Sequence, residues 1–317
     1  MNDAKNVHYL QKDNDYRIIK EPGILILSSN EAYLTLPWCR KYFQKEPTEG
    51  YFIYITKTPK KTLLTNTLIC SSNIVQSPTN LIIIEENISA KLYNTCASTK
   101  PNLNGKHFGQ TKIIVKNNAS LTLNHFQNWG KKDTVVSQTD LILNQNSEVV
   151  FNQKCSNVPK ILKMTNRNFL AENTSLNYLT HLLSNSGNIK MYDDTYLNGE
   201  KSKGISRIRL IGKKNSNIYA RSRMIANTSG TGHVDCMGLL LDQNSIITAI
   251  PELINKNKEA SLTHEASIGK ISDEILYYLR SRGLTEDQAI DLVVNGFLGE
   301  DEKIIIDGNL VSSKEFM

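Results

Sequence analysis

Asparagine-rich corners followed by alternating apolar and polar positions recur from residue 85 to residue 262. Segments such as NNASLTLN, QNSEVVFN and QNSIITAI each carry an Asn and a small polar residue at their start. The corners are Asn118, Asn146, Asn173, Asn215 and Asn244. They follow one another at a nearly constant interval, except that one and a half intervals separate the third from the fourth. Gly187 and Lys258 mark intermediate copies, each half an interval after such a corner. The repeat is therefore a half-turn of about fourteen residues, two per coil.

A strand in each half-turn, without a helical stretch between, predicts a mainly β fold. Asn and Gly adopt the left-handed conformation of tight corners, and β-branched residues favour strands. A period in this range is typical of a β-solenoid, and a right-handed parallel β-helix is the favoured architecture. The alternative is an antiparallel sandwich with Asn-rich hairpins, against which the regular spacing counts. We expect an α/β cap over residues 1–48, a β-helix core over 49–265, whose sheet starts at GYFIYITK (50–57), and a helical region and tail over 266–317.

The periodicity changes to a helical one after residue 271. Ser272, Asp273 and Glu274 form a helix start, and a first helix with one apolar face runs to Gly283. Thr285 and Gln288 form a capping box for a second helix. Its apolar stripe consists of Ile290, Val293, Val294 and Phe297. Because a β-helix leaves its last coil open, the two helices are expected either to cover that edge or to dock a partner.

Composition places this chain among cytoplasmic proteins with free thiols. Its five cysteines are odd in number and include no CxxC pair, which argues against a disulfide framework. The N-terminal stretch MNDAKNVHYLQKDNDY is polar and predicts no secretory signal, and no apolar run approaches the roughly 18 residues of a membrane span. The net charge of +6 is densest in residues 201–223. There Arg207 and Arg209 alternate with Ile208 and Leu210, which indicates the solvated face of a strand and disfavours a nucleic-acid surface.

The sequence lacks the common catalytic motifs. Gly212-Lys213 and Gly269-Lys270 lack the Ser or Thr of a phosphate-binding loop, so no direct ATP site is expected. His264 and Glu265 are not a zinc-protease helix, because position 268 is Ile. A β-helical carbohydrate-active enzyme would need paired carboxylates on one face, and the one candidate pair is Asp193 with Asp194. Adjacent residues on a strand would point to opposite faces, and the stretch DDTYLNGE is more typical of a turn.

The stretch HEASIGKISDEILYYLRSRGLTEDQAIDLVVNGF, residues 264–297, resembles the signature of the SufB/SufD family of iron–sulfur cluster assembly proteins. DCMGLLLDQNS (235–245), FQNW (126–129) and GYFIYITK resemble further family landmarks, so the resemblance covers about residues 50–298. It implies a scaffold rather than an enzyme, and a right-handed parallel β-helix, which agrees with the repeat.

The resemblance also implies roles for individual residues. Cys236 falls on the cluster-assembly cysteine of SufB, Glu265 on its essential glutamate, and His264 on a histidine of both subunits. Cys96, followed by His107, falls on the cysteine that first accepts sulfur. Cys155 matches no motif and is interpreted as a core cysteine, with a relay role as the alternative. This mixture of SufB and SufD residues suggests a homodimer, with pairing to a SufB/SufD paralogue as the alternative.

Thiolate, imidazole and carboxylate groups suit transient binding of an iron–sulfur cluster. His264 and Glu265 follow Cys236 by one coil of the repeat, so we expect the three side by side at roughly 5 Å. By the same period, Cys96 and Cys236 are expected to lie five coils apart. A SufC-like ABC ATPase is the partner that the family implies, with a sulfur donor and apo iron–sulfur proteins; a purely structural adaptor to the ATPase is a further alternative. The residues expected to dock the ATPase are Ile275, Leu279, Glu286, Asp287, Ile290 and Val294.

Overall fold

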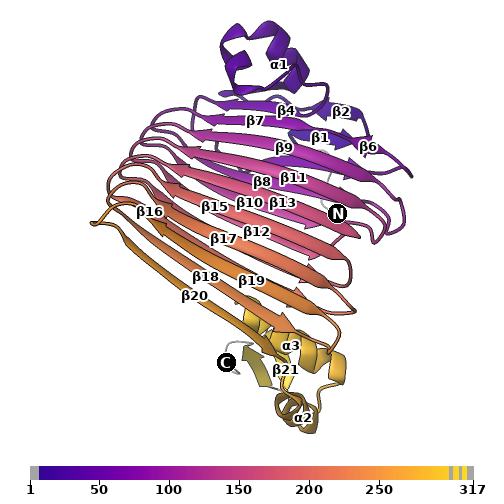
Figure 1. Ribbon diagram of the computed structural model, residues 1–317. Coiled ribbons are helices and arrows are strands. Elements are labelled where there is room, and N and C mark those ends of the chain that lie inside the picture. Colours follow the sequence, from indigo (N-terminus) through magenta and orange to yellow (C-terminus); the bar gives the residue numbers. More distant parts are fainter. Residues whose placement is uncertain (1–6, 300–302, 307–308, 313–317) are drawn as a thin grey trace.

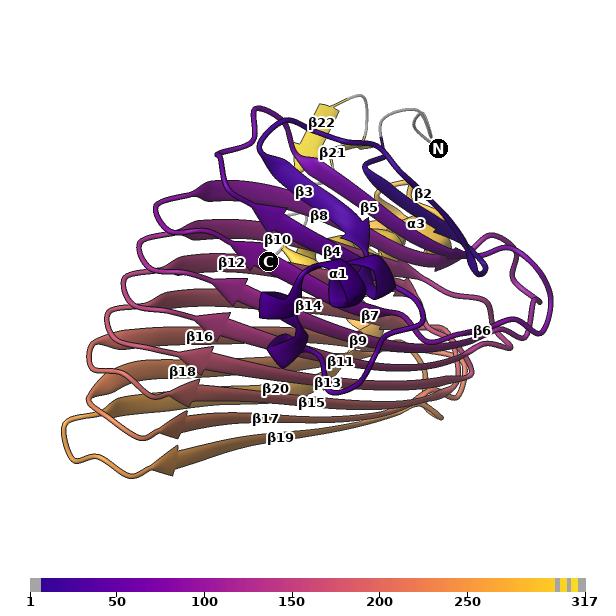
Figure 2. The ribbon, with the colours of Figure 1, turned by 90° about the horizontal axis from the view of Figure 1, so that it is seen from above.

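The computed structural model describes residues 7–299, 303–306 and 309–312, and two long β-sheets dominate it (Figure 1). The chain alternates between the sheets and adds one strand to each per coil, so that strands of neighbouring coils pair in parallel. The result is a β-solenoid of about eight turns, which confirms the predicted parallel β-helix. Helix α1 lies at the end that carries the N-terminal strands, in front of the first coils in Figure 2, and α2 and α3 lie at the other end.

The first sheet, here sheet A, has ten strands in the order β2-β1-β5-β8-β10-β12-β14-β16-β18-β20. They are β1 (Tyr9–Lys12), β2 (Asp15–Ile18), β5 (Leu63–Ile69), β8 (Ser89–Ser98), β10 (Ser120–Asn128), β12 (Glu148–Asn157), β14 (Ser175–Ser184), β16 (Ser202–Gly212), β18 (Gly230–Leu240) and β20 (Ser261–Lys270).

The second sheet, sheet B, runs in the order β19-β17-β15-β13-β11-β9-β7-β4-β3, and β6 pairs with β9 beside it. Its strands are β3 (Ile24–Ser28), β4 (Tyr51–Ile55), β6 (Val75–Gln76), β7 (Thr79–Ile84), β9 (Lys106–Val115), β11 (Thr134–Leu143), β13 (Ile161–Leu170), β15 (Asn188–Leu197), β17 (Asn217–Ala226) and β19 (Ile246–Asn255).

The half-turn repeat is confirmed in the corners. From β11 to β17, each strand begins one half-turn of sequence after the strand before it. Asn118, Asn146, Asn173 and Asn215 have φ between 53° and 62°, the left-handed conformation that tight corners require. The amides of Asn118, Asn146 and Asn173 also form a ladder, with hydrogen bonds of 2.9 and 2.8 Å between successive coils. At Asn244, in contrast, the backbone N–H donates to Asp242.

The N-terminal strands belong to the two sheets. β1 pairs in parallel with β5, and β3 pairs antiparallel with β4. The sheet therefore begins before the segment GYFIYITK, and the expectation that it starts there is wrong. Helix α1 (Ser29–Thr35) and the 3-10 helix η2 (Pro37–Tyr42) cover apolar side chains on the outer face of the first coils, among them Phe52, Leu81, Ile83 and Ile114.

The C-terminal helices form as predicted but pack elsewhere than on the last coil. α2 spans Asp273–Ser281 and α3 spans Glu286–Leu298, with the capping box of Thr285 and Gln288 in place. α3 lies on the outer face of sheet A, where its apolar stripe contacts Leu183, Ile211 and Leu239 of three paired strands. The expectation that the helices cover the open edge is therefore wrong, and β20 stays exposed along almost its whole length. β21 (Lys303–Ile306) and β22 (Asn309–Ser312) pair antiparallel.

None of the helices in the described part of the chain has both the length and the apolar character to cross a membrane.

Candidate functional site

Cys236 lies on β18, the strand next to the end of sheet A, and its side chain points into the solenoid. Only 1% of the residue is exposed. It belongs to a core cluster that also contains Cys96 and Cys155. Three of the five cysteines thus share one interior, and all five are free thiols.

The parallel register between β18 and β20 decides which side chains share a face. Paired residues of a parallel ladder point to the same side of the sheet, and successive residues alternate. The pairs are Val234 with His264, Asp235 with Glu265, and Cys236 with Ala266. Cys236 and His264 therefore share the inner face, while Glu265 lies on the outer face.

Glu265 is separated from the Cys236 thiol by the sheet itself. Its partner Asp235 carries an ion pair with Arg209 on the outer face, with 2.6 Å between Oδ2 and Nη2. The expectation that thiol, imidazole and carboxylate lie side by side in one chain is wrong, because the register puts Glu265 one coil away but on the opposite face. Within residues 7–299 and the β21–β22 pair, no group of three or more His, Cys, Asp and Glu side chains is placed to hold a metal ion.

Small side chains surround Cys236 toward the open end of the solenoid. Ala266 pairs with it on β20, and Ala220 belongs to the same core cluster. Ala249 on β19 pairs with Ala220 and packs against that cluster. Cys236 thus lies one coil beneath the end of the solenoid, with alanines at the corresponding positions of the last coil.

The Cys236 thiol is protonated in the isolated chain. Burial, with a smaller contribution from Asp235, raises the pKa of this thiol to about 11, although Arg209 acts to lower it. A thiol binds a metal ion only after it loses its proton. For Cys236 to bind a metal ion, the incoming cation must therefore displace this proton.

Cys96 and His107 lie in the earlier coils, on β8 and β9. Cys96 is 7% exposed, and burial raises the pKa of its thiol to about 12. The ring of His107 packs against Trp129 at 5.0 Å between centroids, and burial lowers the pKa of this histidine to about 3. A cavity of about 220 Å³ at the neighbouring corner is lined by Ser98 and Trp129, among others. Five strand steps of sheet A, β8 to β18, separate Cys96 from Cys236, which confirms the predicted five coils.

Cys155 occupies the same inward row as Cys96. Gln127 on β10 pairs with Cys96 on one side and with Cys155 of β12 on the other. Burial raises the pKa of the Cys155 thiol to about 12. Cys155 was interpreted as a core cysteine because it matches no family motif. The strand register places it two coils after Cys96, in the same row.

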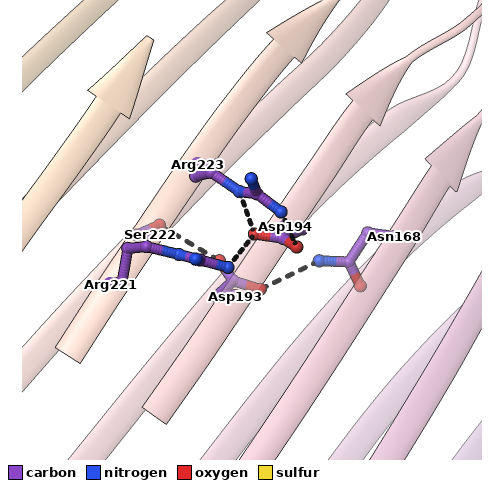
Figure 3. Close-up of polar contacts among 6 residues, drawn as sticks. All are labelled: Asn168, Asp193, Asp194, Arg221, Ser222 and Arg223. Atoms are coloured by element: carbon purple, nitrogen blue, oxygen red, sulfur yellow. Dashed lines mark hydrogen bonds and ion pairs between the residues drawn. The ribbon is translucent and has the colours of Figure 1, made fainter. Parts of the chain in front are cut away.

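Asp193 and Asp194 point to opposite faces of β15, as the close-up shows (Figure 3). Asp194 forms outer-face ion pairs with Arg223 at 2.6 Å and Arg221 at 3.4 Å. Asp193 is fully buried and accepts a hydrogen bond from Asn168 at 3.1 Å. The stretch is a strand rather than the expected turn, and these two carboxylates cannot share one substrate. The carbohydrate-enzyme alternative therefore loses its candidate pair.

The segment of densest basic charge is divided between the two sheets. Arg207 and Arg209 lie on the outer face of sheet A, whereas Arg221 and Arg223 lie on that of sheet B. Arg209 forms an ion pair with Asp235, and Arg221 and Arg223 form ion pairs with Asp194. The run forms no continuous basic surface.

The predicted docking residues divide into buried and exposed groups. Leu279 and Val294 are buried by the chain itself, and Ile290 is half-buried in the contact with sheet A. These three therefore hold the helices in place, which corrects their expected part in a docking surface. Three side chains that remain exposed are Ile275, Glu286 and Asp287. Two tyrosines that the sequence analysis passed over join them, Tyr277 at 77% and Tyr278 at 49% exposure.

Known proteins are similar in sequence to this chain over most of its length. The family model described as SUF system FeS cluster assembly, SufBD core domain, matches residues 67–297. An iron–sulfur cluster assembly SufBD family protein of Archaeoglobus fulgidus is 27% identical over 310 residues, which is 92% of this chain and 84% of the relative.

Two further archaeal relatives carry the same family description. One from Methanothermobacter thermautotrophicus (strain Winter) is 30% identical over 236 residues, 74% of this chain and 58% of the relative. One from Pyrococcus horikoshii is 28% identical over 285 residues, 89% of this chain and 63% of the relative. The chain thus spans less than two thirds of the length of these two relatives.

Proposed function

Because this chain belongs to the SufBD family of iron–sulfur cluster assembly proteins, we propose that it is the scaffold of a SUF-type complex and builds a nascent cluster at Cys236. The observation that carries this proposal is the position of Cys236, an inward-facing thiol one coil beneath the open end. His264 offers an imidazole on the same inner face of the next strand. Soft thiolate and borderline imidazole ligands suit iron and sulfide, and a small ligand set allows release. The cluster is the cargo of this site.

Sulfur would enter at Cys96, beside His107, and move through the interior to Cys236. At roughly 4.8 Å per strand, five steps correspond to about 24 Å, well beyond the reach of a side chain. The transfer therefore needs intermediate stations. Gln127 and Cys155 line the first part of that path in one inward row.

A second copy of the chain would complete the assembly. β20 is the last strand of sheet A and leaves one edge unpaired. An exposed edge strand pairs readily with another strand, and two identical edges can do so about a two-fold axis. Such a homodimer, or the equivalent pairing with a SufB/SufD paralogue, would bring the Glu265 carboxylate of one chain toward the open end of the other.

An ABC-type ATPase of the SufC kind would dock on the C-terminal helices. The exposed side chains Ile275, Tyr277 and Tyr278 provide apolar anchors, and Glu286 and Asp287 provide charge at the start of α3. Interfaces commonly combine such tyrosine anchors with a polar rim. ATP hydrolysis would belong to that partner, and the chain itself would act as a scaffold rather than an enzyme. Its five free thiols suit a reducing, cytoplasmic setting, where a sulfur donor and apo iron–sulfur proteins would be its other partners.

Anaerobic reconstitution with ferrous iron and sulfide tests this proposal. The wild-type protein should develop cluster absorption bands, and Cys236→Ala should not. Cys70→Ala is the control, since Cys70 is also free but lies in the first coils. Absence of cluster bands in the wild type would favour a purely structural adaptor to the ATPase, and full cluster formation in Cys236→Ala would overturn the site.

A further inference from the structure

The cavity of about 220 Å³ beside Cys96 lies where successive coils turn from sheet A to sheet B. The ends of β8, β10, β12 and β14 and the turns that follow them form its walls. Its lining includes Lys100 of the first turn, Lys131 of the second and Asn185 of the fourth. Both lysines are exposed, so the cavity lies at the surface of the molecule.

The inner wall of this cavity is formed by residues next to Cys96. Ser98 lines the cavity, and Cys96 is the preceding inward residue of β8, about 7 Å away along the strand. Trp129, which is 4% exposed, lines it as well and donates a hydrogen bond from its indole N–H to Gln127 at 3.0 Å. Gln127 is the strand partner of Cys96, so the cavity and the thiol are separated by one layer of side chains.

The charge around the cavity is positive. Lys100 and Lys131 line it, and the described lining residues include no acidic side chain. The nearby Asp133 is buried, and its carboxylate accepts hydrogen bonds from Ser98 at 2.5 Å and from two backbone N–H groups at 2.6 and 2.8 Å. Its charge is thus met by these donors beneath the surface. An acidic segment of a partner would be attracted to the two lysines.

A side chain in the cavity lacks a hydrogen-bond donor. Oδ1 of Asn185 is buried and has no partner among the residues that the structure describes, whereas its Nδ2 donates to Asn157 at 3.3 Å. Buried acceptors are normally hydrogen-bonded, so an acceptor left over in a cavity points to a ligand with a donor group. The backbone N–H groups of a polypeptide would supply one.

We propose that this corner cavity docks the sulfur donor protein, through an acidic segment that carries the donor's persulfide to Cys96. The inference rests on the proposed function and adds the docking surface and the charge of the partner. In the transfer, the Cys96 sulfur attacks the outer sulfur of the persulfide. A new S–S bond forms at Cys96, the S–S bond of the donor breaks, and the thiol proton of Cys96 passes to the donor's departing sulfur.

Two synthetic heptapeptides test this surface on the full chain. Each carries a central cysteine persulfide, flanked by glutamates in one peptide and by lysines in the other. Mass-tag trapping measures the rate at which each loads Cys96, and the acidic peptide should be about tenfold faster at low salt. The variant Lys100→Glu with Lys131→Glu should abolish this preference. Lys163→Glu with Lys190→Glu is the charge-matched control, because both lysines are exposed on sheet B, and it should keep the preference.

The outcomes separate this inference from the proposed function. Equal loading of Cys96 by the two peptides in the wild type overturns the docking surface and leaves Cys96 as the entry point. Loading by free cysteine persulfide as fast as by the acidic peptide also overturns it, because the cavity then admits small persulfides without docking a protein. Cluster assembly at Cys236 from free sulfide bypasses the cavity, so the Lys100 and Lys131 variant should assemble a cluster as the wild type does. If neither peptide loads Cys96 while Cys236 still assembles a cluster, the inference falls with the entry role and the assembly site stands.

Discussion

Cys236 and Glu265 lie on paired strands of one sheet and on opposite faces of it. The thiol points into the solenoid, and the carboxylate stands beside Asp235 on the outer surface. The two groups can therefore act on the same cluster only if another chain, or a movement of β20, brings a carboxylate to the open end. In the proposed function, a role for Glu265 at Cys236 therefore depends on a second chain or on a movement of β20.

The first prediction concerns that dependence. Glu265→Ala should lower the cluster yield per chain about tenfold, as loss of a supporting ligand usually does. The decrease should be present at protein concentrations where the chain is dimeric and should vanish where it is monomeric. Reconstitution followed by absorption, over a dilution series with the mass measured in parallel, checks this. Glu259→Ala, an exposed carboxylate just before β20, is the control. A decrease of equal size in the monomer would show that Glu265 acts within its own chain.

The second prediction concerns the ATPase surface. Reversal of the two charges at the start of α3, in the variant Glu286→Lys with Asp287→Lys, should weaken binding of the ATPase about tenfold. Tyr277→Ser should have at least as large an effect, because it removes the most exposed aromatic ring of α2. Titration of the partner by calorimetry measures both, and Glu259→Lys is the charge-matched control.

Deletion of the helices would be a poor test of the same surface. Leu183, Ile211 and Leu239 on sheet A are covered by α3, so removal of the helices would expose an apolar strip and favour aggregation. Point changes on the exposed side chains avoid this. Wild-type affinity in both exposed-face variants would place the ATPase elsewhere on the chain.

The third prediction concerns the pH dependence of stability. Burial raises the pKa of Asp193 in the folded chain to about 6, above its ordinary value of 3.8, so the folded state favours the protonated carboxyl. Its contribution is most favourable below pH 3.8 and is lost as the pH rises to 6, by up to about 3 kcal/mol. Asp193→Asn should therefore be more stable than the wild type above pH 6, and the difference should shrink toward pH 4. Urea unfolding in the absence of iron at several pH values measures this, with Asp194→Asn as the control. A stability difference independent of pH would mean that Asp193 is not ionised in the fold.

The sequence predicted the solenoid because its corners are local. A left-handed Asn once per coil, as at Asn118 and Asn146, is a requirement of the backbone that no distant contact can override. The capping box of Thr285 and Gln288 was predictable for the same reason. The resting place of α3 was not, because it depends on an apolar strip formed by three strands from three coils.

The site was predicted in part, and the rest depended on which face of the sheet each side chain occupies. The coil length placed Cys236 and Glu265 on adjacent strands, yet a shift of one residue moves a side chain through the sheet. The interior position of Asp193 was within reach, since MYDDTYL alternates as a strand does. It was passed over because two consecutive aspartates are typical of turns.

The last prediction concerns the path of sulfur. In the scheme proposed above, Cys96 accepts sulfur first and Cys236 uses it, and Cys155 lies two strands from Cys96 in one inward row. A persulfide on Cys96 passes its outer sulfur when another thiolate attacks it, so that one S–S bond forms, one breaks and Cys96 leaves as a thiolate. Since both early thiols are buried with raised pKa values, this step requires local opening of the first coils. Mass-tag trapping of persulfides should show label at Cys96 first, and Cys96→Ala should abolish persulfide loading of Cys236 from a protein sulfur donor. Cys39→Ala is the control, because Cys39 is buried in the cap outside the interior cluster. Undiminished loading of Cys236 by the donor in Cys96→Ala would mean that sulfur reaches the open end directly and that Cys96 is a core cysteine.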